Sequence, residues 1–250
     1  MSKRIGCCLV FALVLPFSGH SMAQDRVYRN GIDPNFPPFT YVDKYGVSEG
    51  FDVKALDWIA REIGFRVEHL PMPWDDIIKV LKKRDIDIIA SGLSITEERK
   101  EQVNFTIPYW TIKPVIVARQ DSVLTVGQIL DKGNKLGVQR GTTEAKWIEE
   151  HLVKKGVKKC TLVYFDSTPL AVEAVVKGRI AGAAMDDAPA RDAARKRPVK
   201  IVGGFGMADE RFGYAVRKED TRLLEMLNEG LTRLMGSPHW AELKKKYELE

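Results

Sequence analysis

Segments typical of strands alternate with segments typical of amphipathic helices from Arg26 onward, and this alternation limits the possible folds more than any other feature. Short apolar runs rich in β-branched residues favour strands, and apolar residues three or four positions apart favour helices. The first part of the chain predicts strands at residues 27–32, 67–70 and 85–90, with helices at 52–63 and 75–83 between them. This order is typical of a parallel sheet covered by helices.

The pattern restarts after Pro108. It predicts strands at residues 113–118, 136–139, 161–165 and 180–185, with helices at 143–155 and 170–177. The tail, residues 221–249, is helical in period and contains no strand pattern. We therefore expect an α/β protein with two βα lobes, each large enough for its own core, and a helical tail packed on one of them.

The first 23 residues have the composition of a signal peptide. Lys3 and Arg4 precede an apolar stretch at residues 5–17, and Ser21 and Ala23 provide the small residues of a cleavage site. We expect export with cleavage after Ala23. The apolar stretch is too short for a comfortable membrane span, and no later segment approaches the roughly 20 apolar residues that a span needs. Cleavage leaves Cys160 as the remaining cysteine, so we expect no internal disulfide.

The charge of the chain argues against nucleic acid as a partner. Removal of Lys3 and Arg4 lowers the formal net charge from +5 to +3. The remaining basic runs lie near predicted helix ends, where cations are favourable and face water. We therefore expect no nucleic-acid partner.

A run of polar residues, SGLSITEER at residues 91–99, directly follows the strand predicted at 85–90. In open α/β sheets, ligands bind beyond the carboxyl ends of the strands, so the hydroxyls of Ser91, Ser94 and Thr96 are expected to face a crevice. The Arg99 guanidinium can hold a carboxylate with two parallel hydrogen bonds. The alternative is that Thr96 caps a helix and Arg99 faces water. The two interpretations are compatible.

A second polar segment follows the strand predicted at 136–139. Thr142 and Thr143 precede a helix whose first amides favour anions, although either residue could simply cap that helix. The strand predicted at 180–185 ends in Asp186 and Asp187. Asp186 could hold an ammonium group, and Asp187, close to a proline, is better suited to cap the following helix.

Aromatic residues accompany these polar segments. Phe36 lies in a proline-stiffened loop after the first strand, and Trp74 opens the helix after the second. We expect both to line the crevice, whereas Phe39 is expected to seal the core.

Several chemistries are excluded by their missing motifs. The sequence has no Gly-x-Ser-x-Gly nucleophile elbow and no phosphate loop with Gly-Lys-Ser/Thr. The histidines that remain after cleavage, His69, His151 and His239, lack metal-ligand spacing. The glycines at residues 203–206 are not followed by the helix that dinucleotide binding requires, so they favour a chain crossing. We expect no cofactor and no metal.

Taken together, the motifs resemble those of the periplasmic solute-binding proteins of the polar amino acid family, bacterial extracellular solute-binding protein family 3, which serve ABC importers. The resemblance covers nearly the whole mature chain. It rests on DPNFPPF at residues 33–39, EGFDV at 49–53, SGLSITEER at 91–99, RGTTE at 140–144 and GRIAGAAMDD at 178–187. One departure is the pair Ala181 and Gly182, close to a position where the family commonly has an acidic residue.

The resemblance implies a type II periplasmic-binding-protein fold in which two lobes close over a ligand. It implies a signal peptide at residues 1–23, lobe 1 at 24–114 plus 208–250, and lobe 2 at 115–207. The two crossings between lobes would lie near residues 113–119 and 203–212. It also implies a periplasmic monomer that delivers an amino acid to an ABC transporter permease in the inner membrane.

By the same resemblance, Arg99 and the amides of Ser94 and Thr143 would bind the α-carboxylate of the ligand. Asp186, the Ser94 hydroxyl and the Ser91 carbonyl would bind its α-ammonium, and Phe36 and Trp74 would flank its side chain. Asp33 and Glu144 make the pocket more negative, which favours lysine, arginine or a similar cation over glutamate. The expected ligand-binding residues are Asp33, Phe36, Trp74, Ser91, Gly92, Ser94, Arg99, Thr143, Glu144 and Asp186.

Binding without catalysis is the main expectation. Two alternatives share the fold: an exported cyclohexadienyl-dehydratase-like enzyme acting on cyclic carboxylates, and a ligand-sensing module for a separate receptor. An enzyme would need a general acid or base aimed at the ligand, and Glu144 and Asp186 are the candidates.

Overall fold

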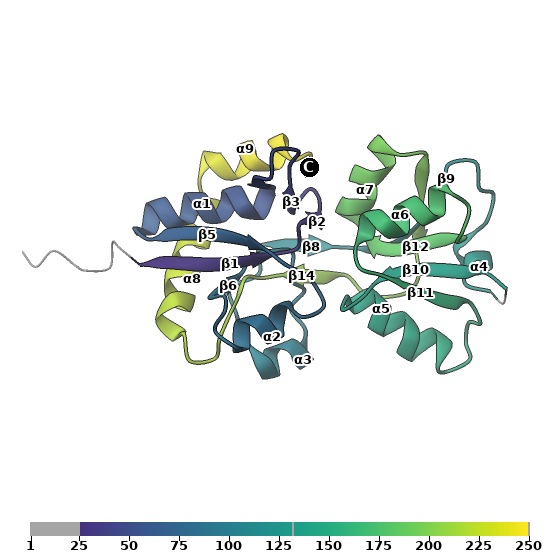
Figure 1. Cartoon of the computed structure of the whole chain (residues 1–250), viewed down its shortest axis with the longest axis horizontal. Coiled ribbons are helices and arrows are strands. Elements are labelled where there is room, and N and C mark those ends of the chain that lie inside the picture. Colours follow the sequence, from purple (N-terminus) through teal and green to yellow (C-terminus); the bar gives the residue numbers. More distant parts are fainter. Residues whose placement is uncertain (1–25, 132, 250) are drawn as a thin grey trace, which may run out of the picture.

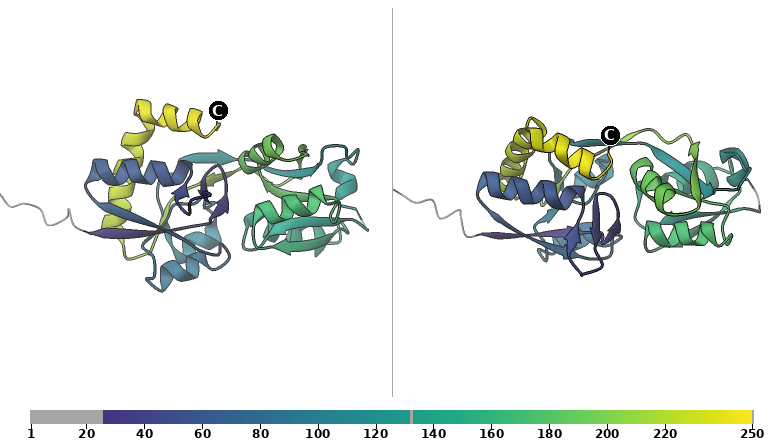
Figure 2. Two further views of the ribbon diagram at one scale, coloured as in Figure 1. Left: turned by 45° about the horizontal axis from the view of Figure 1, so that its top comes forward. Right: turned by 90° about the horizontal axis from the view of Figure 1, so that it is seen from above.

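The computed structural model describes residues 26–131 and 133–249 of the 250-residue chain. The predicted signal peptide, residues 1–23, lies outside the described residues. Two five-stranded sheets lie side by side along the long axis, and helices cover both faces of each sheet (Figures 1 and 2). None of the described helices is long and apolar enough to cross a membrane.

The first lobe consists of the elements around the sheet β5-β1-β6-β15-β7. In this sheet β1 pairs in parallel with β5 and β6, and β15 pairs antiparallel with β6 and β7. The strands are β1 (Val27–Ile32), β5 (Arg66–Pro71), β6 (Ile88–Ile89), β7 (Asn104–Phe105) and β15 (Ala215–Val216). The helices are α1 (Phe51–Ile63), α2 (Ile77–Lys82), α3 (Glu97–Gln102), α8 (Thr221–Met235) and α9 (Pro238–Lys246). A small sheet of β2 (Asn35–Phe36), β3 (Thr40–Val42) and β4 (Ser48–Glu49) connects β1 to α1.

The second lobe consists of the elements around the sheet β11-β10-β12-β9-β13. Here β10 pairs in parallel with β11 and β12, while β9 runs antiparallel to β12 and β13. The strands are β9 (Pro114–Arg119), β10 (Lys135–Gln139), β11 (Thr161–Phe165), β12 (Gly182–Asp186) and β13 (Val199–Gly204). The helices are α4 (Val126–Ile129), α5 (Thr143–Ile148), which continues as a π-helical turn (Glu149–Val153), α6 (Thr168–Val176) and α7 (Asp187–Lys196).

Two short strands carry the chain between the lobes. β8 (Trp110–Ile112) leads from the first sheet to the second, and β14 (Glu210–Phe212) leads back. They pair antiparallel, with Trp110 opposite Phe212, and lie between the two sheets (Figure 1). We call β8 and β14 the crossing strands. The first one precedes residues 113–119, where a crossing was expected, because most of that segment pairs within the second sheet as β9.

Most predicted elements are confirmed. β1 and β11 have the predicted bounds, and α1 begins one residue before the predicted helix and ends before Gly64 as expected. Gly64 adopts a left-handed conformation with φ 89°, which only glycine adopts at little cost, and its N–H bonds the Ala60 carbonyl. The tail forms α8 and α9, which pack against α1 in the first lobe.

Several predicted elements have different bounds in the structure. The strand expected at 85–90 shortens to β6 because the Asp87 carboxylate accepts a hydrogen bond from the Arg29 N–H at 3.0 Å, in place of a ladder carbonyl. The helix expected at 75–83 begins at Ile77, after a turn closed by the Trp74 carbonyl. The helix expected at 143–155 changes from α to π geometry at Glu149.

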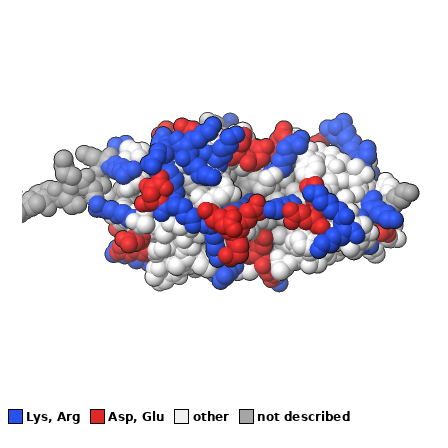
Figure 3. All heavy atoms as spheres, turned by 90° about the horizontal axis from the view of Figure 1, so that it is seen from below, with Lys and Arg blue, Asp and Glu red and all other residues white. Residues whose placement is uncertain are grey.

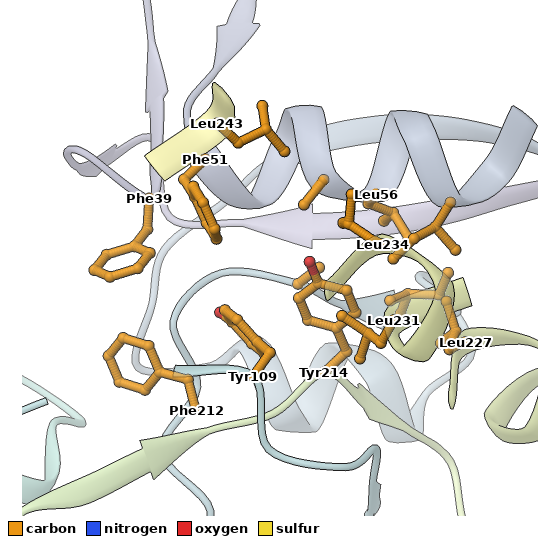
Figure 4. Close-up of a cluster of buried hydrophobic side chains, with 14 of the residues drawn as sticks. Phe39, Phe51, Leu56, Tyr109, Phe212, Tyr214, Leu227, Leu231, Leu234 and Leu243 are labelled. Carbon is orange, nitrogen blue, oxygen red and sulfur yellow. The ribbon is translucent and has the colours of Figure 1, made fainter. Parts of the chain in front are cut away.

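The helical tail packs closely on α1. Figure 4 shows Leu227, Leu231 and Leu234 of α8 directed towards Leu56 of α1. The helices approach at Gly230, where an added Cβ would lie 2.3 Å from Cγ2 of Ile59. The contact therefore needs a residue without a side chain.

Replacing Gly230 with alanine should destabilise the first lobe. The methyl group would force Ile59 out of its position, and overpacking of this kind costs about 1–3 kcal/mol, more than the gain in helix propensity of about 1 kcal/mol. Urea unfolding should show a lower midpoint for Gly230→Ala. The matched control is Gly127→Ala in α4, whose nearest neighbour would lie at 3.8 Å. Equal stability of the two variants would contradict the packing argument.

Candidate functional site

A small cavity lies between the two lobes. Every residue of the predicted ligand-binding set except Ser91 lines it, together with Gln139 and Thr142. The wall residues are Asp33, Phe36, Trp74, Gly92, Ser94, Arg99, Gln139, Thr142, Thr143, Glu144 and Asp186. Because strands of both sheets end at this cavity, each lobe contributes side chains from loops that follow its strands.

Arg99 faces the cavity from α3. Its Nη1 donates to the Ser94 carbonyl at 3.0 Å, its Nη2 donates to the Gly141 carbonyl of the second lobe at 3.1 Å, and it lies 5.9 Å from the Trp74 ring centroid. Among the described residues, no carboxylate forms an ion pair with this guanidinium. Burial lowers the pKa of Arg99, and nearby acidic residues, Glu210 first, oppose that shift. The side chain can therefore receive an anion from outside the protein.

Of the three residues whose hydroxyls were expected to face the crevice, Ser94 lines the cavity, Thr96 lines a wider groove outside it, and Ser91 lines neither. Ser91 is 1% exposed, and its Oγ accepts from the Asp33 N–H at 3.0 Å and bonds the Thr40 hydroxyl at 2.8 Å. Thr96 caps α3 by accepting from the Arg99 N–H at 3.2 Å. Capping satisfies a free amide of the helix start, so this alternative is correct for Thr96 while Arg99 still lines the cavity.

Asp186 faces the cavity from the end of β12. It is 8% exposed, and its Oδ1 is buried without a hydrogen-bond partner among the described residues. Burial raises the pKa of Asp186 well above its ordinary value, and the nearby Glu144 carboxylate raises it further. A buried carboxylate oxygen with no donor is costly, so this position favours a cationic or hydrogen-bonding ligand group.

The helix after β12 begins differently from the prediction. Asp187 was expected to cap it, but Asp186 occupies the N-cap position and Asp187 is the first helical residue. The Asp187 Oδ1 accepts from the Lys113 N–H at 3.1 Å, and its Oδ2 pairs with Arg191 at 2.6 Å. Bonds to Lys113, just before β9, and within α7 thus hold this side chain in place.

Thr142 and Thr143 have separate roles at the start of α5. Thr142 is the cap, since its Oγ1 accepts from the Ala145 N–H at 3.3 Å. The Thr143 hydroxyl instead donates to Glu210 of the crossing strand β14 at 2.6 Å. This bond holds a carboxylate of the crossing strand near the cavity. Burial raises the pKa of Glu210.

The aromatic residues lie largely as expected. Phe39 is fully buried in the first-lobe core, and Phe36 stacks on it with ring centroids 5.6 Å apart while also lining the cavity. Trp74 is partly buried and lines the cavity beside Arg99.

Two acidic side chains were predicted to make the pocket negative. Glu144 is 3% exposed. Asp33 is 3% exposed, and its Oδ2 accepts from Nε2 of Gln139 at 2.8 Å, across the gap between the lobes. Burial raises the pKa of Asp33. The cavity therefore has buried carboxyl groups in both lobes.

Gln139 and Glu210 were not among the residues predicted to bind the ligand. Gln139 is the last residue of β10, so its place at a strand end was available as a signal. Its Oε1 accepts from the Thr168 hydroxyl at 2.8 Å, which orients its amide group towards Asp33. Glu210 lies in a crossing strand, and only the folded chain brings it to Thr143.

A wider groove lies outside the cavity, between α2 and α5. Its acidic lining includes Asp75, Asp76, Glu98, Glu149 and Glu150. Glu98 forms an ion pair across the groove with Lys146 of the second lobe. Figure 3 shows acidic side chains gathered near the middle of the face seen from below, with basic side chains on either side. Among the described residues, no cluster of His, Cys, Asp or Glu is arranged to hold a metal ion.

The raised pKa of Asp186 predicts a dependence of stability on pH. Folded chains keep the Asp186 proton above its ordinary pKa of 3.8, whereas unfolded chains release it, so this group lowers stability as pH rises through that window. Asp186→Asn cannot ionise. Urea unfolding without ligand should give an advantage for the variant that is near zero at acidic pH and grows towards neutral pH. Asp166→Asn, at an exposed pair with Arg140, is the control, and equal growth in both variants would contradict the prediction.

Comparisons with known proteins agree with this geometry. Among solved structures, holo ArgBP from T. maritima has a TM-score of 0.74 at 35% identity, covering 88% of this chain and 96% of that one. The ancestral amino acid-binding protein AncCDT-1, a precursor of cyclohexadienyl dehydratase, has a TM-score of 0.80 at 31% identity, covering 88% and 95%. The predicted two-lobed α/β fold, of the type II periplasmic-binding class, is confirmed.

Sequence comparison also finds amino-acid-binding proteins. The histidine-binding periplasmic protein of Escherichia coli (strain K12) is 31% identical over 251 residues, covering 96% of this chain and 95% of the relative. The family model of the bacterial extracellular solute-binding proteins, family 3, matches residues 28–250. That match extends over both sheets and both crossing strands, and the chain is a member of this solute-binding family.

Proposed function

We propose that this chain binds an amino acid with a cationic side chain in the periplasm and delivers it to the permease of an ABC importer in the inner membrane. The main observation is a pair of unmatched groups in one cavity: the Arg99 guanidinium without a carboxylate partner, and the buried Asp186 Oδ1 without a donor. An amino acid carries both complementary charges on one carbon atom, so it satisfies both groups together.

The backbone end of the ligand would be held as follows. Arg99 and the amides of Ser94 and Thr143 bind the α-carboxylate. Asp186, the Ser94 hydroxyl and the Ser91 carbonyl bind the α-ammonium. Charge-assisted hydrogen bonds of this kind are about twice as strong as neutral ones, which suits a ligand that must lose its water on binding.

The side chain of the ligand would lie between Phe36 and Trp74. Asp33 and Glu144 add negative charge around it, and both are almost fully buried. A cationic end would compensate charge that is otherwise expensive to bury, whereas a second carboxylate would increase the repulsion. The names of relatives support this preference, since they include histidine-binding and arginine-binding proteins.

The proposal includes the arrangement of the chain. The signal peptide, residues 1–23, is removed after Ala23, and the mature protein acts as a monomer. Lobe 1 comprises residues 24–114 plus 208–250, lobe 2 comprises residues 115–207, and the lobes close over the ligand about the crossing strands. Catalysis is not part of the proposed function.

Calorimetric titration of the mature protein, refolded free of carried-over ligand, tests the proposal. The panel should contain the twenty amino acids, amines without a carboxylate, and cyclic carboxylates. Cationic amino acids should bind most tightly, and saturation at a hundred times the dissociation constant should add about 2.7 kcal/mol of stability. Binding of no amino acid would overturn the proposal, and turnover of a cyclic carboxylate would favour the dehydratase-like alternative.

Arg99→Ala should reduce binding of every amino acid by at least about a hundredfold, because losing a charge-assisted contact to a buried carboxylate costs roughly 3 kcal/mol or more. The matched control is Arg140→Ala, which removes a second arginine whose partner is the exposed Asp166. Its affinities should stay close to those of the wild type. Similar losses in both variants would contradict a specific role for Arg99.

Asp33→Asn should weaken cationic ligands selectively. The change removes a charge, but asparagine retains a carbonyl acceptor for the Gln139 amide, so the lobes can still meet. We expect about a tenfold loss or more for arginine and lysine, the value of one charged hydrogen bond, and less than about threefold for neutral amino acids. Calorimetry on both ligand classes checks this. Equal losses for both classes would remove the charge argument.

A further inference from the structure

The segment from Ser91 to Ser94, which we call the ligand ledge, rests on a fully buried carboxylate. Asp52 lies in the first turn of α1 and is 0% exposed. Its Oδ2 accepts from the Gly92 N–H at 2.7 Å and from the Tyr109 hydroxyl at 2.7 Å. Its Oδ1 is buried and has no hydrogen-bond partner among the described residues. The carboxylate therefore lies on the core side of the ledge, opposite the cavity that Gly92 lines.

The bond to Gly92 determines the direction of the neighbouring carbonyl. The Ser91–Gly92 peptide is trans, since the one cis bond among the described residues joins Pro37 to Pro38. In a trans peptide the N–H and the C=O point in opposite directions. With the Gly92 N–H directed towards Asp52 in the core, the Ser91 carbonyl is directed away from Asp52. No described donor bonds this carbonyl oxygen.

Further contacts restrain the orientation of the Ser91–Gly92 peptide. The Ser91 hydroxyl is bonded to the Asp33 N–H and to Thr40, on the other side of the same peptide. Gly92 has φ +59°, and an added Cβ would lie 2.4 Å from Cε1 of Phe36. Gly92 thus has no room for a side chain and sits in a conformation that favours glycine.

Burying a carboxylate at this position costs free energy. Burial raises the pKa of Asp52 to about 7, even though the bonds from Tyr109 and Gly92 favour the anion. The Tyr214 hydroxyl beside it is also buried without a partner among the described residues, and Figure 4 shows the Tyr109 and Tyr214 rings close together below α1. An apolar side chain would fill the same space at lower cost, so packing alone does not account for an acid here.

We propose that Asp52 is a positioning residue that fixes the Ser91–Gly92 peptide so that the Ser91 carbonyl oxygen accepts a hydrogen bond from the α-ammonium of the ligand. This inference rests on the proposed function, because it deepens the recognition of the amino acid backbone. Asp52 does not touch the ligand. It acts through its hydrogen bond to the Gly92 N–H.

The test compares each amino acid with its deaminated analogue, which keeps the α-carboxylate and the side chain but lacks the ammonium. The dissociation constant of the analogue divided by that of the amino acid measures recognition of the ammonium group. Asp52→Ala removes the acceptor and should lower this ratio about tenfold, the loss of one charged hydrogen bond. Asp52→Asn retains an acceptor oxygen and should leave the ratio within about twofold of the wild type.

Tyr109→Phe is the matched control. It removes the other hydrogen bond to the same Asp52 oxygen, and so perturbs the core, but it leaves the Gly92 bond intact. Its ratio should stay at the wild-type value even if its stability falls. A merely structural role for Asp52 would weaken both ligands of each pair equally in Asp52→Ala, and that result would overturn the proposal.

Amide hydrogen exchange of the wild-type protein provides a test that needs no variant. The Gly92 N–H should exchange slowly without ligand, because it is bonded to a buried carboxylate. Exchange at the rate of an unprotected peptide would overturn the proposal even if Asp52→Ala does not fold. Failure of the wild type to bind any amino acid would instead overturn the proposed function, so the two failures are distinguishable.

Discussion

The cavity depends on backbone pairing between the ligand ledge and the crossing strand β14. The Gly213 N–H donates to the Leu93 carbonyl at 3.1 Å, and the Ile95 N–H donates to the Arg211 carbonyl at 2.8 Å. Ser94 and Phe212 form the bridge between these two bonds. The segment that connects the lobes is thus paired directly with the segment that presents Ser94 to the cavity. A displacement of β14 would therefore act directly on the ledge, with no intermediate element.

The second constraint is electrostatic. Asp33, Glu144, Asp186 and Glu210 lie close to a single arginine that faces the cavity, and burial raises the pKa of three of these acids. Such an arrangement lowers the stability of the protein, because buried carboxylates repel one another and lose their water. Folded proteins tolerate this cost at sites where a ligand supplies the missing charge. The charges that destabilise the protein are thus the ones that would select its ligand.

Periodicity made most of the fold predictable, because buried strands and amphipathic helices leave apolar patterns of different spacing. The cavity residues were also largely accessible from sequence, since the carboxyl ends of strands mark the edge where a ligand can bind. The errors arose where a side chain competes with the backbone. The Asp87 carboxylate accepts from an N–H that would otherwise pair in the ladder, which shortens β6. Asp187 bonds the Lys113 N–H and Arg191 instead of capping α7. Glu210 could not be found because its place beside Thr143 exists only after both crossings form.

The hydrogen bond between Asp33 and Gln139 has a further consequence for energetics. The two lobes meet through groups that satisfy each other, and the contacts of Arg99 with Gly141 and of Glu98 with Lys146 also join them. In the proposed closing of the lobes, formation of these contacts has its own equilibrium constant, separate from the intrinsic affinity of the closed site. The measured dissociation constant is the intrinsic one divided by the fraction of molecules in the competent form. Glu98 and Lys146, which join the lobes outside the cavity, can thus tune how much ligand the protein captures at a given concentration without contacting the ligand.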